Sequence, residues 1–112
     1  MAAGERRREA RYVVDAVNLI AAGECWPLID ISATGARVSC TPQEYERVGD
    51  IPKDLEFNRD GVRTLFRIEP YVIRRADLYI VLGFDPPTPD WENHIRQFDT
   101  FHVRELDDQL FD

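Results

Sequence analysis

Cysteine and long apolar runs are both scarce in this 112-residue sequence, which has two cysteines, Cys25 and Cys40. Neither has the neighbours of a zinc site or a Cys-x-x-Cys pair, so we expect two buried core thiols. No run reaches the roughly 18 apolar residues of a membrane span, and no signal-peptide pattern follows the N-terminal arginines. The sequence therefore predicts a cytoplasmic protein without membrane insertion.

Basic charge is also in short supply, because 14 Lys and Arg residues face 21 Asp and Glu residues, for a net charge of -7. Residues 1–40 are balanced, with five basic and five acidic side chains, so the whole acidic excess lies beyond them. Such a chain repels a nucleic-acid backbone, which disfavours general nucleic-acid binding. A small anionic ligand remains compatible, since a few arginines within one Debye length dominate its surroundings.

The composition is that of one soluble domain, with 44% hydrophobic, 31% charged and 11% aromatic residues. A chain of this length can bury a core without disulfides or metals. We divide it into an arginine-rich arm at 1–11, expected to be flexible, a folded domain at 12–104 and an acidic tail at 105–112.

Six strands are predicted from runs of β-branched and aromatic residues. They cover residues 12–20, 25–31, 36–40, 55–57, 62–75 and 78–84. Ser32–Gly35 and Asn58–Gly61 are expected to be hairpin turns, and Pro70 is expected to bend the long fifth strand.

Two helical segments complete the prediction. Residues 42–47 are expected to form one short turn of helix that begins at a proline. In the last segment, Thr88 is the expected N-cap and Pro89 the first helical residue, with Trp91, Ile95 and Phe98 on one apolar stripe. Short hairpins followed by one terminal helix favour an all-β fold, a six-stranded antiparallel β-barrel with a C-terminal α-helix.

Candidate binding residues fall in two places that a strand pair brings together. Arg7 and Arg11 precede the first strand, whereas Asp30, Ser32 and Gly35 lie at the next hairpin. An arginine fork matches the O6 and N7 acceptors of guanine, and a carboxylate can accept from its N–H groups. Ser32 and turn N–H groups could hold a phosphate, with Gly35 expected at a positive φ angle that lets a ligand approach closely.

Each string has an ordinary alternative when it is taken alone. A basic N-terminal run is usually a solvated arm, and an Asp-x-Ser-x-x-Gly string is usually a turn that satisfies its own backbone. The combination is more demanding, because it needs both strings, in this order, on either side of two strands.

The two strings and the strand order together resemble the PilZ domain family, across nearly the whole chain. Arg7 to Arg11 match its R-x-x-x-R motif, and Asp30 to Gly35 match its D-x-S-x-x-G motif. The resemblance implies a bacterial receptor for cyclic di-GMP, with the two arginines on guanine and phosphate. It also implies that Arg6, directly before the first motif, accompanies a stacked pair of ligand molecules.

Other residues of the sequence are weaker candidates for a site. His94 and His102 fit no metal-ligand spacing and are expected to pack on the helix or face solvent. Ser32 lacks a nucleophile elbow, so we expect no enzyme and no cofactor. Trp26 and Trp91 are expected to be core or helix anchors.

The paired Arg74–Arg75 at a strand end is expected to be solvated or to line the rim of the ligand site. The leading hypothesis is a cyclic di-GMP receptor whose arm rearranges on binding and signals to a partner protein. A PilZ-like interaction module that does not bind the nucleotide is the alternative. A barrel for single-stranded nucleic acid is disfavoured by the charge.

Overall fold

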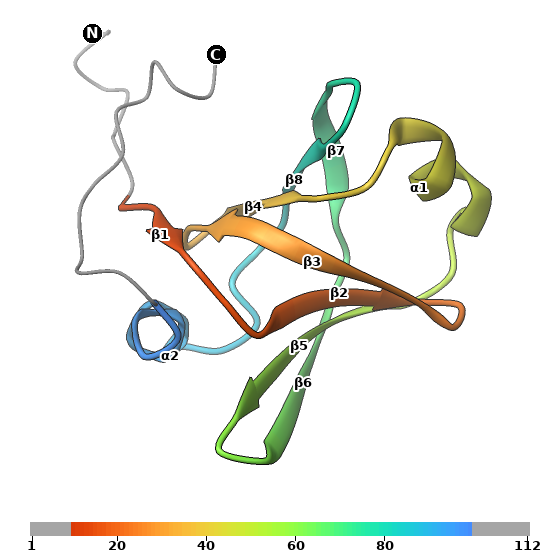
Figure 1. Cartoon of the computed structure of the whole chain (residues 1–112). Helices are drawn as coiled ribbons and strands as arrows, with labels where there is room; N and C mark the ends of the chain where they lie inside the picture. Colours follow the sequence, from red (N-terminus) through yellow and green to blue (C-terminus); the bar gives the residue numbers. More distant parts are fainter. Residues whose placement is uncertain (1–9, 100–112) are drawn as a thin grey trace, which may run out of the picture.

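The computed structural model describes residues 10–99, which form eight strands and two short helices (Figure 1). The strands are β1 (Tyr12–Val13), β2 (Val17–Ala21), β3 (Glu24–Ile31), β4 (Gly35–Val38), β5 (Lys53–Arg59), β6 (Val62–Ile68), β7 (Tyr71–Arg75) and β8 (Ile80–Gly83). The helices are α1 (Pro42–Val48) and α2 (Trp91–Arg96). An antiparallel β fold with a short helix near the C-terminus is therefore confirmed.

The sheet is open and is not the closed barrel that the sequence analysis predicted. Its hydrogen-bonded order is β6-β5-β2-β3-β4-β8-β7, with β1 added alongside β3, so β6 and β7 stand at opposite ends. These end strands follow one another in the chain, separated only by Glu69 and Pro70, and Figure 1 shows β6 running on into β7. The expected bend at Pro70 is confirmed, and it coincides with a change of partner from β5 to β8.

Two strands were missed because long predicted strands are each divided in two. The predicted strand at 12–20 breaks into β1 and β2 at Ala16, whose φ of 61° is incompatible with extended backbone. The carbonyl of Ala16 instead accepts a hydrogen bond from the N–H of Asn58 at 2.9 Å. The predicted strand at 62–75 breaks at Glu69–Pro70, since proline has no N–H to continue a ladder.

Local turn chemistry follows the sequence closely. Asp60 and Gly61 have φ angles of 50° and 81°, which suit the tight hairpin that joins β5 and β6. Thr41 caps α1 in a reciprocal capping box with Glu44, directly before the predicted proline. At the other end of α1, the Nζ of Lys53 donates to the carbonyls of Gly49 and Ile51 at 2.8 and 3.0 Å.

Helix α2 covers the inner side of β5 and β6. Its Trp91 and Ile95 are almost fully buried, and Trp91 meets Phe57 edge to face with 5.7 Å between ring centroids. The apolar stripe is thus confirmed for Trp91 and Ile95, whereas Phe98 lies beyond the last residue of α2, and the predicted N-cap is wrong. Helix α2 begins after Asp90, and the carbonyl of Thr88 accepts only one turn-like hydrogen bond, from the N–H of Trp91.

The two cysteines differ in exposure, so the prediction of two core thiols is half wrong. Cys40 is buried in the core, whereas Cys25 is exposed. Cys25 alternates with the buried Trp26 along β3, which turns its side chain to the other face of the sheet. Among residues 10–99, no helix is long and apolar enough to cross a membrane.

Candidate functional site

The two predicted motif segments meet at one edge of β3. Arg11 directly precedes β1, which pairs with the end of β3 so that Val13 lies opposite Asp30. The Arg11 Nη1 atom lies 3.9 Å from the Oδ1 atom of Asp30. Arg6 and Arg7 lie outside the described residues. The structure therefore brings Arg11 and the Asp30 turn together, and Ser32 and Gly35 follow in that turn.

A cross-strand row of side chains, polar except for the buried Val81, extends from Asp30 over the outer face of the sheet. Asp30 lies opposite Arg37 on β4, Arg37 opposite Val81 on β8, and Val81 opposite Arg74 on β7. The neighbouring Ala36 and Leu82 belong to the core, so alternation directs the row to the opposite face. Strand pairing thus places two further arginines beside the motif.

Asp30 is the buried centre of this row, with none of its surface exposed. Its Oδ2 atom accepts two hydrogen bonds from Arg37, from Nη2 at 2.8 Å and from Nε at 3.2 Å. Its buried Oδ1 atom accepts no hydrogen bond from any described residue. Burial raises the pKa of Asp30, and the charges of Arg37 and Arg11 only partly oppose that shift.

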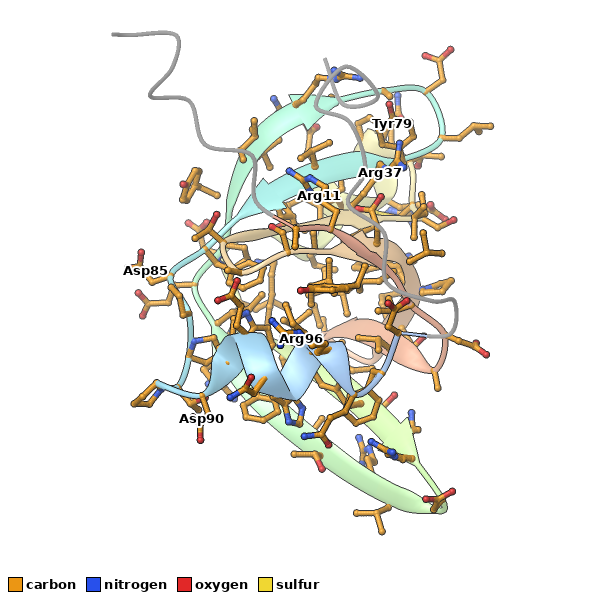
Figure 2. The ribbon with its side chains drawn as sticks, turned by 90° about the vertical axis from the view of Figure 1, so that its left-hand side faces the viewer. Arg11, Arg37, Tyr79, Asp85, Asp90 and Arg96 are labelled. Carbon is orange, nitrogen blue, oxygen red and sulfur yellow. The ribbon has the colours of Figure 1, made fainter. Side chains whose placement is uncertain are left out.

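Tyr79 extends the cluster beyond Arg37. The guanidinium carbon of Arg37 lies 5.1 Å from the centre of the Tyr79 ring, and Nη2 of Arg74 donates to the Tyr79 hydroxyl at 3.0 Å. That hydrogen bond is the largest cause of a lowered pKa at Tyr79. We call Arg11, Asp30, Arg37, Arg74 and Tyr79 the arginine face. Figure 2 shows Arg11, Arg37 and Tyr79 close together, away from α2.

The turn after Asp30 is closed by Ser32 and Gly35. The N–H of Ser32 donates to the carbonyl of Gly35 at 2.8 Å, and the Ser32 hydroxyl lies 3.4 Å from the same oxygen. The predicted positive φ at Gly35 is wrong. Gly35 is needed for another reason, because a Cβ there would lie 2.8 Å from the carbonyl oxygen of Leu82 on β8.

A second glycine makes room for an aromatic ring beside the arginine face. Gly35 lies opposite Gly83 on β8, and Gly83 lies opposite Tyr71 on β7. A Cβ at Gly83 would meet the Tyr71 ring at 2.6 Å, so this ring rests on the glycine backbone while 61% of the residue is exposed. The outer face therefore offers aromatic surface next to guanidinium groups.

Sequence reasoning missed Arg37 and Tyr79. The signal for Arg37 was present, because the alternation of Ala36, Arg37 and Val38 directs the arginine away from the core and a tight turn sets it near Asp30. The two arginines at the end of β7, expected to be solvated or to line the rim of the site, behave differently. Arg74 belongs to the arginine face, whereas Arg75 forms a half-exposed ion pair with Glu46 at 3.4 Å.

The other candidate residues lie elsewhere and do different work. His94 packs among the rings of Phe57, Phe66 and Phe98, as the helix-packing prediction expected, and burial lowers its pKa. His102 lies outside the described residues. Within residues 10–99, no group of three or more His, Cys, Asp or Glu side chains is placed to hold a metal.

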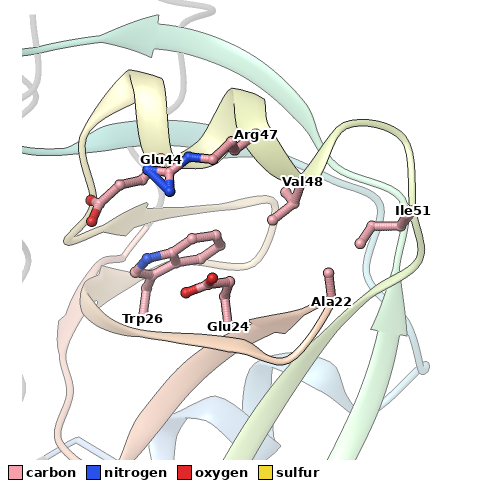
Figure 3. A pocket seen from close by; sticks show the side chains of 7 residues that line it. All are labelled: Ala22, Glu24, Trp26, Glu44, Arg47, Val48 and Ile51. Carbon is pink, nitrogen blue, oxygen red and sulfur yellow. The ribbon is translucent and has the colours of Figure 1, made fainter.

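A pocket of about 400 Å³ lies between β3 and α1, apart from the motif residues (Figure 3). Trp26 and Val48 are buried at its wall, and Glu24, Glu44 and Arg47 surround them. Two carboxylates against one guanidinium make this pocket a poor site for a ligand with two phosphates. The arginine face has the opposite balance, with three guanidinium groups and one carboxylate.

Comparison with known proteins gives no match, either to a protein-family model or to a curated protein. The residues of the candidate site themselves indicate its chemistry. Guanidinium forks bind phosphate oxygens and the acceptor edge of guanine, and their planes and tyrosine rings stack on purines. The arginine face combines these groups, half-buried, on the outer side of the sheet, and such a combination suits an anionic purine nucleotide.

Proposed function

We propose that this chain is a PilZ-like receptor for cyclic di-GMP in a bacterial cytoplasm, and that it signals to a partner protein without catalysing a reaction. The observation that carries the proposal is the meeting of Arg11 and Arg37 on the buried Asp30 carboxylate. Residues from the R-x-x-x-R and D-x-S-x-x-G strings, each of which is a weak signal alone, thereby lie in contact with each other.

The geometry favours a division of roles within the arginine face. Asp30 is completely covered and holds Arg11 and Arg37, so we assign it the positioning of these arginines. Contact between guanine and the Oδ1 atom of Asp30 requires the Arg11 side chain to move aside. Arg11 and Arg37 then contact guanine or phosphate, and Tyr79 offers a ring for stacking.

Arg6 and Arg7 complete the proposed site from outside the described residues. In this proposal, the segment that carries them closes over the bound nucleotide through charge-assisted hydrogen bonds to phosphate. Closure changes the surface near β1, and a partner protein recognises the change. A second stacked nucleotide would be held by Arg6.

Isothermal titration calorimetry of the full chain with cyclic di-GMP tests the proposal. We expect saturable binding with one or two ligands per chain, and at least about a tenfold loss of affinity for Arg7→Ala or Arg11→Ala. Arg67→Ala is the matched control, because Arg67 pairs with Asp54 on the exposed side of β5 and β6. Its affinity should equal that of the unchanged chain.

Two results would count against the receptor. If high concentrations of cyclic di-GMP gave no heat of binding, the receptor would be ruled out. The alternative, a PilZ-like interaction module that does not use the nucleotide, would then remain. Equal binding of cyclic di-AMP would contradict the assigned guanine contacts, since adenine lacks the O6 acceptor.

A further inference from the structure

The arginine face gathers three guanidinium groups, those of Arg11, Arg37 and Arg74, around the single carboxylate of Asp30 and the ring of Tyr79. The chain as a whole has a net charge of -7, so three neighbouring arginines stand out against an acidic background. A surface of this kind attracts polyanions within about one Debye length, whether they belong to a ligand or to the protein itself.

Exposed apolar side chains adjoin this charge. All five large apolar residues that are exposed in residues 10–99 lie between Val62 and Leu78. Ile73 and Leu78, with exposed fractions of 58% and 75%, lie on β7 and in the turn that follows it, next to Arg74 and Tyr79. An occupant of this surface should therefore combine carboxylates with apolar side chains.

Residues 105–112 have this composition. They contain four acids, Glu105, Asp107, Asp108 and Asp112, with no basic residue, and three apolar residues, Leu106, Leu110 and Phe111. Asp99 forms a β-bridge with Val14, and the preceding Val13 lies opposite Asp30. The chain thus leaves the described region beside the Arg11 and Asp30 end of the arginine face. The six peptide steps from Asp99 to Glu105 can span about 20 Å when extended.

We propose that the arginine face is an interaction surface for residues 105–112 of the same chain. Carboxylates of this acidic segment pair with Arg37 and Arg74, and its leucines contact Ile73 and Leu78. Because the two parts are tethered, the effective concentration of the acidic segment at the face is of millimolar order. If the chain is the receptor proposed above, on which this step rests, the segment also competes with cyclic di-GMP for the same guanidinium groups.

The test uses the full chain and a charge-neutralised variant, Glu105→Gln/Asp107→Asn/Asp108→Asn. The contact is measured without nucleotide, through the NMR signals of arginine Nε–H groups. We expect the signals of Arg37 and Arg74 to shift in the variant and that of Arg67 to stay unchanged. Unshifted signals at Arg37 and Arg74 would overturn the proposed contact.

Competition is measured separately by calorimetry with cyclic di-GMP. The variant should bind about three- to tenfold more tightly than the unchanged chain, with the difference shrinking as salt is added. A control variant, Glu24→Gln/Asp50→Asn/Asp60→Asn, removes the same charge near α1 and at the β5–β6 turn and should leave the affinity unchanged.

The two experiments test the contact of residues 105–112 and the binding of cyclic di-GMP separately. Shifted arginine signals with no nucleotide binding in either protein would support the contact and refute the receptor. Equal nucleotide affinity in the two proteins would refute competition while leaving the receptor intact. An equal gain in the control variant would mean that net charge, and not a docked segment, governs the affinity.

Discussion

Two buried carboxylates on the outer face of the sheet are both paired with arginine, yet their environments differ. Asp30 is covered completely, its Oδ1 atom accepts no hydrogen bond from a described residue, and burial raises its pKa. Glu56 on β5 accepts from Arg63, Asn18 and Asn58, and the hydrogen bond from Arg63 is the largest cause of its lowered pKa.

The two carboxylates differ in whether their surroundings favour the ionised or the protonated form. At Glu56 the hydrogen bonds stabilise the ionised form more than desolvation opposes it. At Asp30 desolvation outweighs the two arginines, so the ionised carboxylate lowers the stability of the fold relative to its protonated form.

The largest effect in this comparison is expected for Arg37→Ala. This change removes both hydrogen bonds to Asp30 and leaves a buried carboxylate with only Arg11 nearby. We expect the free energy of unfolding to fall by about 2–4 kcal/mol, measured by urea denaturation at neutral pH. The double change Arg37→Ala/Asp30→Asn should recover most of the loss, because no buried charge then remains.

Arg63→Ala is the matched control at Glu56. The Arg63 side chain is 57% exposed, so the loss should stay below about 1 kcal/mol. Equal losses for Arg37→Ala and Arg63→Ala, or a double variant as unstable as Arg37→Ala, would remove the distinction between the two carboxylates.

Much of the fold could be read from local sequence, because turns and caps depend on neighbouring residues. Asp60–Gly61 and the Thr41 capping box are of this kind. The number of strands could not be read in this way, since at the break the carbonyl of Ala16 bonds to Asn58, which is distant in the sequence. Whether the sheet closes into a barrel depends on whether the two end strands, β6 and β7, pair with each other, and no local sequence pattern determines this.

The candidate site shows the same limit. The motifs marked Arg11 and Asp30, and strand alternation could have placed Arg37 beside them. The contacts of Tyr79 with Arg37 and Arg74 depend on the pairing order β4-β8-β7. Gly35 was singled out for the wrong reason, because the close approach that excludes a side chain is made by β8 rather than by a ligand.

A smaller effect, with opposite signs, is expected when each acid is replaced by its amide. Glu56→Gln should lower the free energy of unfolding by about 1 kcal/mol, because it weakens the charge-assisted bond from Arg63. Asp30→Asn should leave it unchanged or raise it by up to about 1 kcal/mol, since a neutral amide can still accept from Arg37. Urea denaturation of both variants at neutral pH gives the comparison, and a larger loss at Asp30 would reverse our interpretation.

The smallest expected effect is the pH dependence of the stability changes caused by Asp30→Asn and Glu56→Gln. Asp30 has a folded-state pKa above its usual 3.8, so its ionisation lowers stability at higher pH, and this loss is relieved as pH falls through the raised pKa. Glu56 has a folded-state pKa below its usual 4.5, so its contribution is present above that value and is lost as pH falls through the lowered pKa. Between about pH 7 and about pH 3, any gain of Asp30→Asn should therefore vanish first, and the deficit of Glu56→Gln should persist to lower pH. Stability differences that stay constant over this range would show that neither carboxylate titrates as its surroundings require.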